Sequence, residues 1–128
     1  EQGMVYFSSF DSPPRASGRS FYTAVRALDA QTGNLVWEYR RSPRFVDNFI
    51  PGLMSTAGGI VFGSDQSTFF ALSADTGTVL WSAETGGRII SSPITFNVGG
   101  EQFVSIAAGQ DLLTFGLPPR EAASIRSK

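Results

Sequence analysis

Short runs of β-branched and aromatic residues alternate along the chain with short stretches rich in Gly, Asp and Ser. In the middle of the chain, residues 68–73 and 78–84 are two such runs, and the sequence Ala-Asp-Thr-Gly separates them. Two β-rich runs joined in this way predict a β-hairpin, because glycine supplies the positive φ that a tight turn needs. No segment of useful length shows helical periodicity, so the pattern predicts an all-β chain.

The sequence of this hairpin occurs twice in the chain. "ALDAQTGNLVW" at residues 27–37 returns as "ALSADTGTVLW" at residues 71–81, which is 44 positions later. A repeat of this length with four strands is typical of a β-propeller blade. The strands predicted from the pattern lie at residues 3–9, 23–29, 34–40, 53–56, 60–64, 68–73, 78–84, 90–98, 102–108 and 112–117.

The fold predicted from these strands is a partial β-propeller of about two and a half four-stranded antiparallel blades. We expect a partial blade at residues 1–40, a full blade at 52–84, a three-stranded blade at 90–117 and a polar tail at 119–128. The first blade lacks its innermost strand and the last its outermost strand. The N-terminus has neither the basic region nor the long apolar core of a signal peptide. We therefore expect the chain to be a piece of a longer propeller.

Composition narrows the classes of function. The chain has no Cys and no His, which removes Ser-His-Asp triads, Cys-His pairs, disulfides and Cys- or His-based metal sites. A net charge of −1 and the lack of a basic stripe argue against nucleic acid as a partner. No apolar run approaches the ~18 residues of a membrane span.

The repeated hairpin resembles the tryptophan-docking motif of eight-bladed quinoprotein propellers. The motif residues are Ala27, Asp29, Thr32, Gly33 and Trp37 in the first copy and Ala71, Thr76, Gly77 and Trp81 in the second, where Ser73 replaces the aspartate. The stretches "LMSTAGGIVFGSD", "SSPITFNVGGEQFVSIAAG" and "LLTFGLP" resemble the closing blades of PQQ-dependent alcohol dehydrogenases. In that family the missing outer strand of the last blade comes from the N-terminal part of the same chain. We read the motif residues as structural, with each Trp wedged against the neighbouring blade.

The resemblance implies a periplasmic enzyme that binds PQQ and Ca²⁺ and oxidises alcohols or sugars. The family's metal ligands, general base and vicinal cysteine pair lie upstream of the part that this chain matches. No catalytic or metal-binding residue is therefore assigned in this chain, and we expect it to be inactive and to bind neither PQQ nor Ca²⁺ alone. Its expected partners are the remaining blades of the parent chain.

One set of loops is expected on the face of the propeller that the family uses for its cofactor. These loops are residues 10–22, 41–51, 65–67, 85–89 and 109–111, and the first is about 12 residues longer than its counterpart. The residues chosen as cofactor-binding candidates are Arg88, Ile89, Ile90 and Asp111. Further oxygen donors on this face are Asp47, Asn48 and Asp65. The three arginines Arg40, Arg41 and Arg44 could pair with an anionic group, although exposed loop arginines are more often solvated.

Two other interpretations stay open. The chain could belong to a non-enzymatic propeller scaffold of the same superfamily, which binds partner proteins in outer-membrane assembly. It could also be a stand-alone small protein that assembles through its open edges. Unpaired edge strands favour self-association, so the isolated chain is expected to oligomerise or to be only marginally stable.

Overall fold

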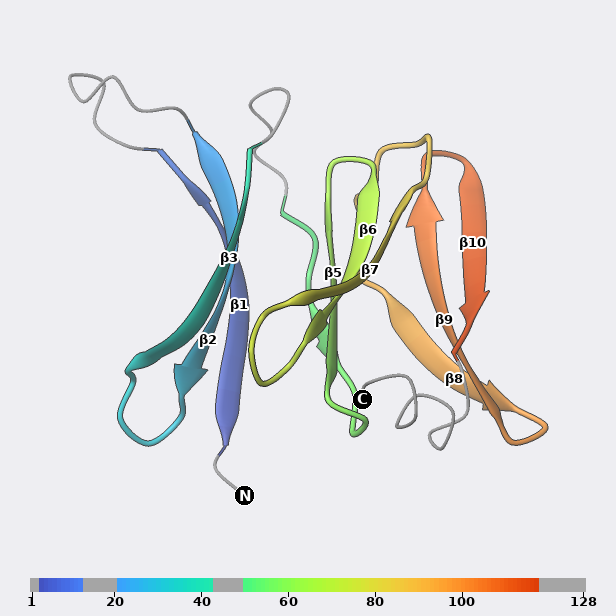
Figure 1. Cartoon of the computed structure of the whole chain (residues 1–128). Helices are drawn as coiled ribbons and strands as arrows, with labels where there is room; N and C mark the ends of the chain where they lie inside the picture. The colour runs from blue at the N-terminus through green and yellow to red at the C-terminus, as the bar shows by residue number, and fades with distance from the viewer. Residues whose placement is uncertain (1–2, 13–20, 43–49, 118–128) are drawn as a thin grey trace.

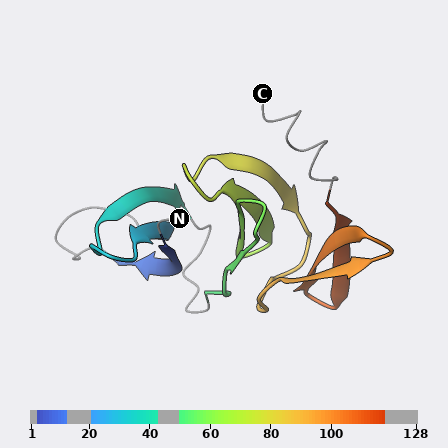
Figure 2. The same cartoon turned by 90° about the horizontal axis from the view of Figure 1, so that it is seen from below.

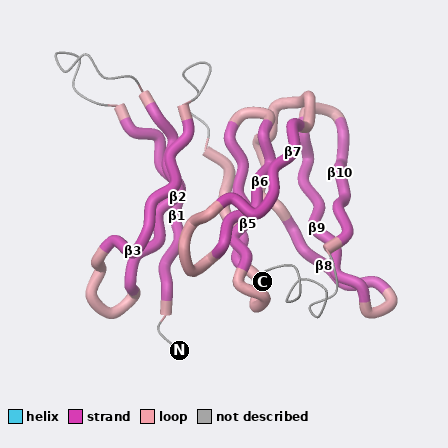
Figure 3. The backbone as a smooth tube through the Cα atoms, viewed as in Figure 1, coloured by secondary structure: helices cyan, strands magenta, loops and turns pink. Residues whose placement is uncertain are grey.

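A computed structural model describes residues 3–12, 21–42 and 50–117 of the 128-residue chain. These residues form ten strands and no helix, which confirms the all-β prediction (Figures 1 and 3). The strands are β1 Met4–Asp11, β2 Tyr22–Asp29, β3 Leu35–Arg41, β4 Met54–Ser55, β5 Ile60–Asp65, β6 Thr68–Ser73, β7 Val79–Glu84, β8 Ile94–Val98, β9 Glu101–Ala108 and β10 Asp111–Gly116. The described part of the chain thus offers no helix that could serve as a membrane span.

The strands form three antiparallel sheets, ordered β1-β2-β3, β4-β5-β6-β7 and β8-β9-β10. We call them blades A, B and C. Every neighbouring pair within a blade is consecutive in sequence, so each blade is a simple meander. Figure 2, seen from below, shows the three blades side by side in chain order, as in part of a propeller. A partial propeller of about two and a half blades was the fold expected from the sequence.

The two copies of the repeat have the same backbone. Gly33 and Gly77 adopt φ values of 73° and 74°, and their N–H groups donate 2.8 Å hydrogen bonds to the carbonyls of Asp29 and Ser73. The pairing register shifts at the same place in each hairpin, directly after Ala27 and Ala71. The Asp29 carboxylate also accepts the N–H groups of residues 31 and 32 at 2.8 and 2.9 Å. In both copies the threonine hydroxyl, of Thr32 or Thr76, accepts the N–H two residues later, at 3.2 or 3.3 Å. A left-handed glycine and an oxygen-capped turn therefore explain why the motif recurs.

The core lies between the blades rather than within one of them. Strand β6 is buried on both sides, and its residues alternate between two clusters. Phe70 and Leu72 pack toward blade A, whereas Phe69 and Ala71 pack toward blade C. The cluster shared with blade A holds Val25, Ala27, Trp37, Phe70 and Leu72. The cluster shared with blade C holds Phe62, Phe69, Ala71, Ile89, Val104, Ile106 and Ala108.

The two motif tryptophans differ in their surroundings. Trp37 is 8% exposed, and its indole Nε1 donates a 2.8 Å hydrogen bond to the Ala74 carbonyl of blade B. Its ring lies over Gly77, where an added Cβ would come within 2.5 Å of the indole. Trp81 is 38% exposed and makes edge contacts with the rings of Phe69 and Phe115 at 5.7 and 4.8 Å. Within the described residues, only Trp37 is fully docked.

The largest error among the predicted strand boundaries is at the start of β8. A strand was expected over residues 90–98, but β8 begins at Ile94. Pro93 has no N–H to donate to a ladder. The hydroxyl of Ser91 instead accepts the Ala107 N–H at 3.3 Å, and Ile89 forms an isolated bridge with Ala108. The chain therefore reaches the inner strand of blade C through an irregular segment.

Candidate functional site

Three described connections leave the blades at the same end, which is the upper end in Figure 1. They are the β5–β6, β7–β8 and β9–β10 connections, at residues 66–67, 85–93 and 109–110. Strand β1 ends, β2 begins and β3 ends at this same end. Most of loop 10–22 and of loop 41–51, including Asp47, Asn48 and Arg44, lies outside the described residues. The expected loop face is therefore described mainly in blades B and C.

Backbone hydrogen bonds lock these connections together. The Ile89 N–H donates to the Gln66 carbonyl at 2.7 Å, and the Gly109 N–H donates to the Arg88 carbonyl at 2.8 Å. The Thr85 hydroxyl donates to the Ser67 carbonyl at 2.8 Å. Turns from blades B and C thus form one connected edge, made of residues 65–67, 85–89 and 109–111, which we call the rim.

Close packing fixes the same rim sterically. At Gly87, a Cβ would come within 2.8 Å of the Ala108 carbonyl, so only glycine fits there without a backbone shift. The absence of a side chain at this position lets the β7–β8 connection lie directly against the end of β9.

The structure brings the four chosen candidates to this rim but gives their side chains different environments. Ile89 is 1% exposed and belongs to the core cluster between blades B and C. Arg88, Ile90 and Asp111 are exposed, with Ile90 at 56%. Ile89 consequently anchors the rim from beneath, and its three companions are the side chains that a molecule at this end could contact.

A polar bridge joins blades A and B near this end. The Asp65 carboxylate lies 3.3 Å from Nε of Arg41 and accepts the Thr23 hydroxyl at 3.1 Å. Arg41 also donates to the Tyr39 hydroxyl at 3.0 Å, and its guanidinium lies 5.6 Å from the Phe70 ring centre. Asp65 was expected as a free oxygen donor and Arg41 as a solvated cation. Both are instead engaged between the blades.

The bridge borders a small cavity of about 20 Å³. Its lining includes Ser8, Thr23, Tyr39, Arg41, Pro51 and Asp65. This volume is about that needed for one water molecule and is far below that of an organic cofactor. Among the described residues, no group of three acidic side chains could hold a metal ion. Neither the cavity nor the described acidic side chains therefore form a cofactor site on their own.

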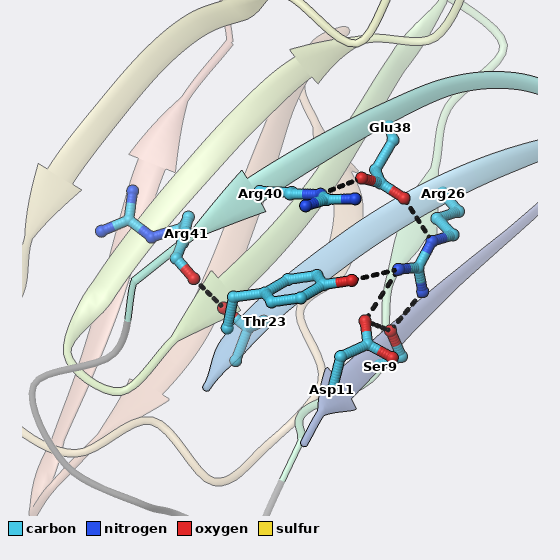
Figure 4. A network of polar contacts seen from close by, with 8 residues as sticks. Ser9, Asp11, Thr23, Arg26, Glu38, Arg40 and Arg41 are labelled. Atoms are coloured by element: carbon cyan, nitrogen blue, oxygen red, sulfur yellow. Dashed lines mark hydrogen bonds and ion pairs between the residues drawn. The ribbon is translucent and has the colours of Figure 1, made fainter. Parts of the chain in front are cut away.

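A second polar cluster, missed in the sequence, lies on the face of blade A that points away from blade B (Figure 4). Arg26 donates to Glu38 Oε2 at 2.6 Å, to Asp11 Oδ2 at 2.7 Å and to the Ser9 hydroxyl at 2.6 Å. Glu38 also pairs with Arg40. We call Ser9, Asp11, Arg26, Glu38 and Arg40 the Arg26 cluster. The clue in the sequence was the hairpin register, which places Arg26 directly opposite Glu38.

The cluster shifts the pKa values of its members in the directions that favour charge. Hydrogen bonding to Asp11, followed by that to Glu38, raises the pKa of Arg26 despite partial burial. Burial alone would raise the pKa of Asp11, but hydrogen bonds from Arg26 and Ser9 outweigh it and lower this pKa. Hydrogen bonds from Arg40 and then Arg26 lower the pKa of Glu38. The four ionisable groups are therefore charged near neutral pH, and their charges cancel.

Comparisons with known proteins agree with this architecture. A PQQ-type family model described as "Outer membrane protein assembly factor BamB" matches residues 20–115. A quinoprotein ethanol dehydrogenase of Pseudomonas putida is 39% identical over 88 residues, which cover 67% of this chain and 13% of that protein. The chain therefore spans only about an eighth of the length of this curated relative.

Solved structures give the same picture. The quinohemoprotein alcohol dehydrogenase of Comamonas testosteroni matches with a TM-score of 0.62 and 27% identity, over 74% of this chain and 14% of that one. BamB from Moraxella catarrhalis matches with a TM-score of 0.58 and 19% identity, over 77% of this chain and 34% of that one, which is a likeness of fold. With its docked Trp37, its paired turns and these matches, the chain belongs to the PQQ-type repeat family of the quinoprotein β-propeller superfamily.

Proposed function

We propose that this chain is the closing segment of the propeller of a PQQ-dependent dehydrogenase that oxidises alcohols or sugars. In this role it lines the mouth of the cofactor channel and supplies no catalytic group. The observation that carries the proposal is the rim of residues 65–67, 85–89 and 109–111, which backbone hydrogen bonds hold rigid at one end of blades B and C. The sequence similarity to a quinoprotein ethanol dehydrogenase supports it.

The described residues of this chain do not by themselves fit PQQ or Ca²⁺. The cavity between blades A and B is too small for an organic cofactor, and the described residues hold no cluster of carboxylates for a hard cation. The rest of the parent chain would hold both groups, so no catalytic step is assigned to the residues of this chain. Arg88, Ile90 and Asp111 would border the channel mouth, while Ile89 would keep this border in place. The proposed compartment is the periplasm.

A second candidate is a non-enzymatic propeller scaffold of the outer membrane. The description of the matching family and the fold of BamB from Moraxella catarrhalis favour it. The rim would then be a surface for partner proteins rather than the edge of a cofactor site. The two candidates predict different properties of the protein in the cell.

The first experiment is to probe a lysate of the source organism with an antibody raised against residues 3–118. A band several times larger than 13.7 kDa would support the parent propeller. The large protein would then be purified and assayed for alcohol oxidation with added PQQ and Ca²⁺. Oxidation supports the dehydrogenase. A large protein that oxidises no alcohol or sugar, and that co-purifies with outer-membrane proteins, supports the scaffold. A band near 13.7 kDa contradicts the dehydrogenase and supports an assembling or scaffolding role of the short chain itself.

A further inference from the structure

The carboxylate of Asp65, beside the cavity between blades A and B, uses only one of its two oxygens. The Thr23 hydroxyl and Arg41 Nε both bond to Oδ2, at 3.1 and 3.3 Å. Oδ1 receives no hydrogen bond from the described residues, although a carboxylate can accept about four. The Asp65 side chain is only 11% exposed, and a nearly buried charged oxygen without a donor is costly. Oδ1 therefore calls for a donor inside the seam.

The hydroxyl of Tyr39, on the other side of the same cavity, has the complementary need. It accepts Arg41 Nη1 at 3.0 Å, so its acceptor capacity is used. Among the described residues, no group accepts the proton of this hydroxyl, and Tyr39 and Asp65 share no hydrogen bond. A tyrosine hydroxyl that is shielded from solvent usually finds such a partner. Blade A thus presents an unused donor and blade B an unused acceptor, and both residues line the cavity.

The cavity has the size and the further partners that one water molecule requires. Its volume is about 20 Å³, and a buried water needs about 10–15 Å³ and two to four polar partners. Tyr39 and Asp65 supply two of these partners. Ser8 and Pro51 also line the cavity, and the bond from the Ser8 hydroxyl to the Pro51 carbonyl is long, at 3.3 Å. The Pro51 carbonyl can therefore accept a second hydrogen bond.

The charges beside the cavity favour a neutral occupant. Arg41 and Asp65 carry opposite charges and lie 3.3 Å apart, so the charge of the pair is balanced. A cation in the cavity would be repelled by the guanidinium, and an anion would be repelled by the carboxylate. An apolar occupant would leave the Tyr39 donor and the Asp65 acceptor unpaired. A small, neutral molecule that both accepts and donates hydrogen bonds satisfies all of these conditions.

From these observations we propose that the cavity is a binding site for a single structural water molecule that joins blades A and B. The water accepts the Tyr39 hydroxyl proton and donates to Asp65 Oδ1 and to the Pro51 carbonyl. It completes the seam at the loop end, as the bond from Trp37 to the Ala74 carbonyl does toward the opposite end. This inference concerns the contact between two blades, so it does not depend on the proposed enzymatic role.

The first test is a crystal structure of the full chain, at a resolution that shows ordered water. One water should lie about 2.7–3.0 Å from both the Tyr39 hydroxyl and Asp65 Oδ1. Crystals soaked in rubidium bromide should give no anomalous peak in the cavity, because both ions scatter anomalously and neither belongs there. A dry cavity, an ion peak at the site, or a direct bond between Tyr39 and Asp65 would overturn the proposal.

The second test compares two variants of Ser8 in solution. Ser8→Ala and Ser8→Val both remove the hydroxyl, but only valine adds methyl groups that compete with the water. In urea denaturation, the folded-to-unfolded ratio of Ser8→Val should be about fivefold lower than that of Ser8→Ala, because Tyr39 and Asp65 lose their bridge. Valine is the better strand former, so propensity alone predicts the reverse order. An equal or higher ratio for Ser8→Val would show that the cavity is dry. If Ser8→Val does not fold, the crystal structure of the wild type decides.

Discussion

The indole Nε1 of Trp37 donates a 2.8 Å hydrogen bond to the carbonyl of Ala74, 37 residues further along the chain and in the next blade. This bond joins two sheets that share no strand ladder. Trp81 holds the same place in the next repeat, yet it is 38% exposed. The two tryptophans therefore form a matched pair for measuring what docking contributes.

Replacing Trp37 by Phe should lower the free energy of unfolding by about 2 kcal/mol, because the change removes an indole donor from a buried carbonyl and part of a buried ring. The same change at Trp81 should cost less than about 1 kcal/mol in the isolated chain. Urea denaturation followed by circular dichroism measures both. Equal costs at the two positions would show that the Ala74 contact contributes nothing specific.

A second matched pair is Gly77 and Gly33. Both adopt positive φ, so an Ala at either position strains the backbone by about 1 kcal/mol. Gly77→Ala should cost about 1–3 kcal/mol more than Gly33→Ala, because only its Cβ meets the Trp37 ring. The difference in urea midpoint between the two variants isolates the steric part. It should disappear when Trp37 is first replaced by Ala.

The Arg26 cluster should make stability depend on pH in the acid range. The pKa values of Asp11 and Glu38 lie below their usual values of 3.8 and 4.5 in the folded chain. Depressed pKa values stabilise the fold above the unfolded values, and this contribution is lost as the pH falls through the folded pKa values. Thermal melts should therefore show a decline in stability below about pH 4.5.

The Arg26→Met variant should lose about 1 kcal/mol near neutral pH, a modest figure because solvent screens the pairs. Its stability should also fall less steeply in acid. Arg40→Met should flatten the acid limb less, since it leaves the bond between Arg26 and Asp11 intact. If the stability of both variants falls with decreasing pH as steeply as that of the wild type, other carboxylates cause the dependence on acid pH.

Variants of Ile89 and Ile90 should distinguish a side chain that stabilises the rim from one that contacts a molecule bound at the rim. Ile89→Ala opens a cavity beneath the rim and should cost about 2–4 kcal/mol of stability. Ile90→Ala removes an exposed side chain and should change the stability of the isolated chain by less than about 0.5 kcal/mol. In the proposed parent dehydrogenase, Ile90→Ala should instead alter KM. An unchanged KM would place Ile90 away from the channel mouth.

The isolated chain should self-associate through its open edges. Strand β10 ends its sheet in the described structure, and Leu112 on it is 71% exposed. Light scattering should give a mass above 13.7 kDa, and Leu112→Lys should shift it toward the monomer. Glu101→Lys, which adds a lysine away from that edge, is the control. A stable, monodisperse wild-type monomer would contradict the expectation.

Local chemistry in the sequence already determined the strands and turns of this protein. The positive φ of Gly33 and Gly77 and the capping oxygen of Asp29 act within a few residues, so the repeat could be read without a structure. The predicted start of β8 was wrong, because the Ser91–Ala107 contact and the Ile89–Ala108 bridge replace a regular strand there. These contacts join residues that are distant in sequence, so the local pattern does not reveal them.

Only the tertiary structure decided which copy of each repeated residue is buried in a contact between blades. Trp37 and Trp81 carry the same local pattern, yet Trp37 is buried with its indole bonded to the Ala74 carbonyl, whereas Trp81 packs edge-on against Phe115 of blade C and stays 38% exposed. Val61, which pairs with Leu72, is buried, and Val5, which pairs with Leu28 at the equivalent place, is exposed. The same holds for Asp65 and Arg41, which read as solvated loop charges and meet across two blades. Residue types and spacings specify the blade, whereas the contacts between blades give each residue its role.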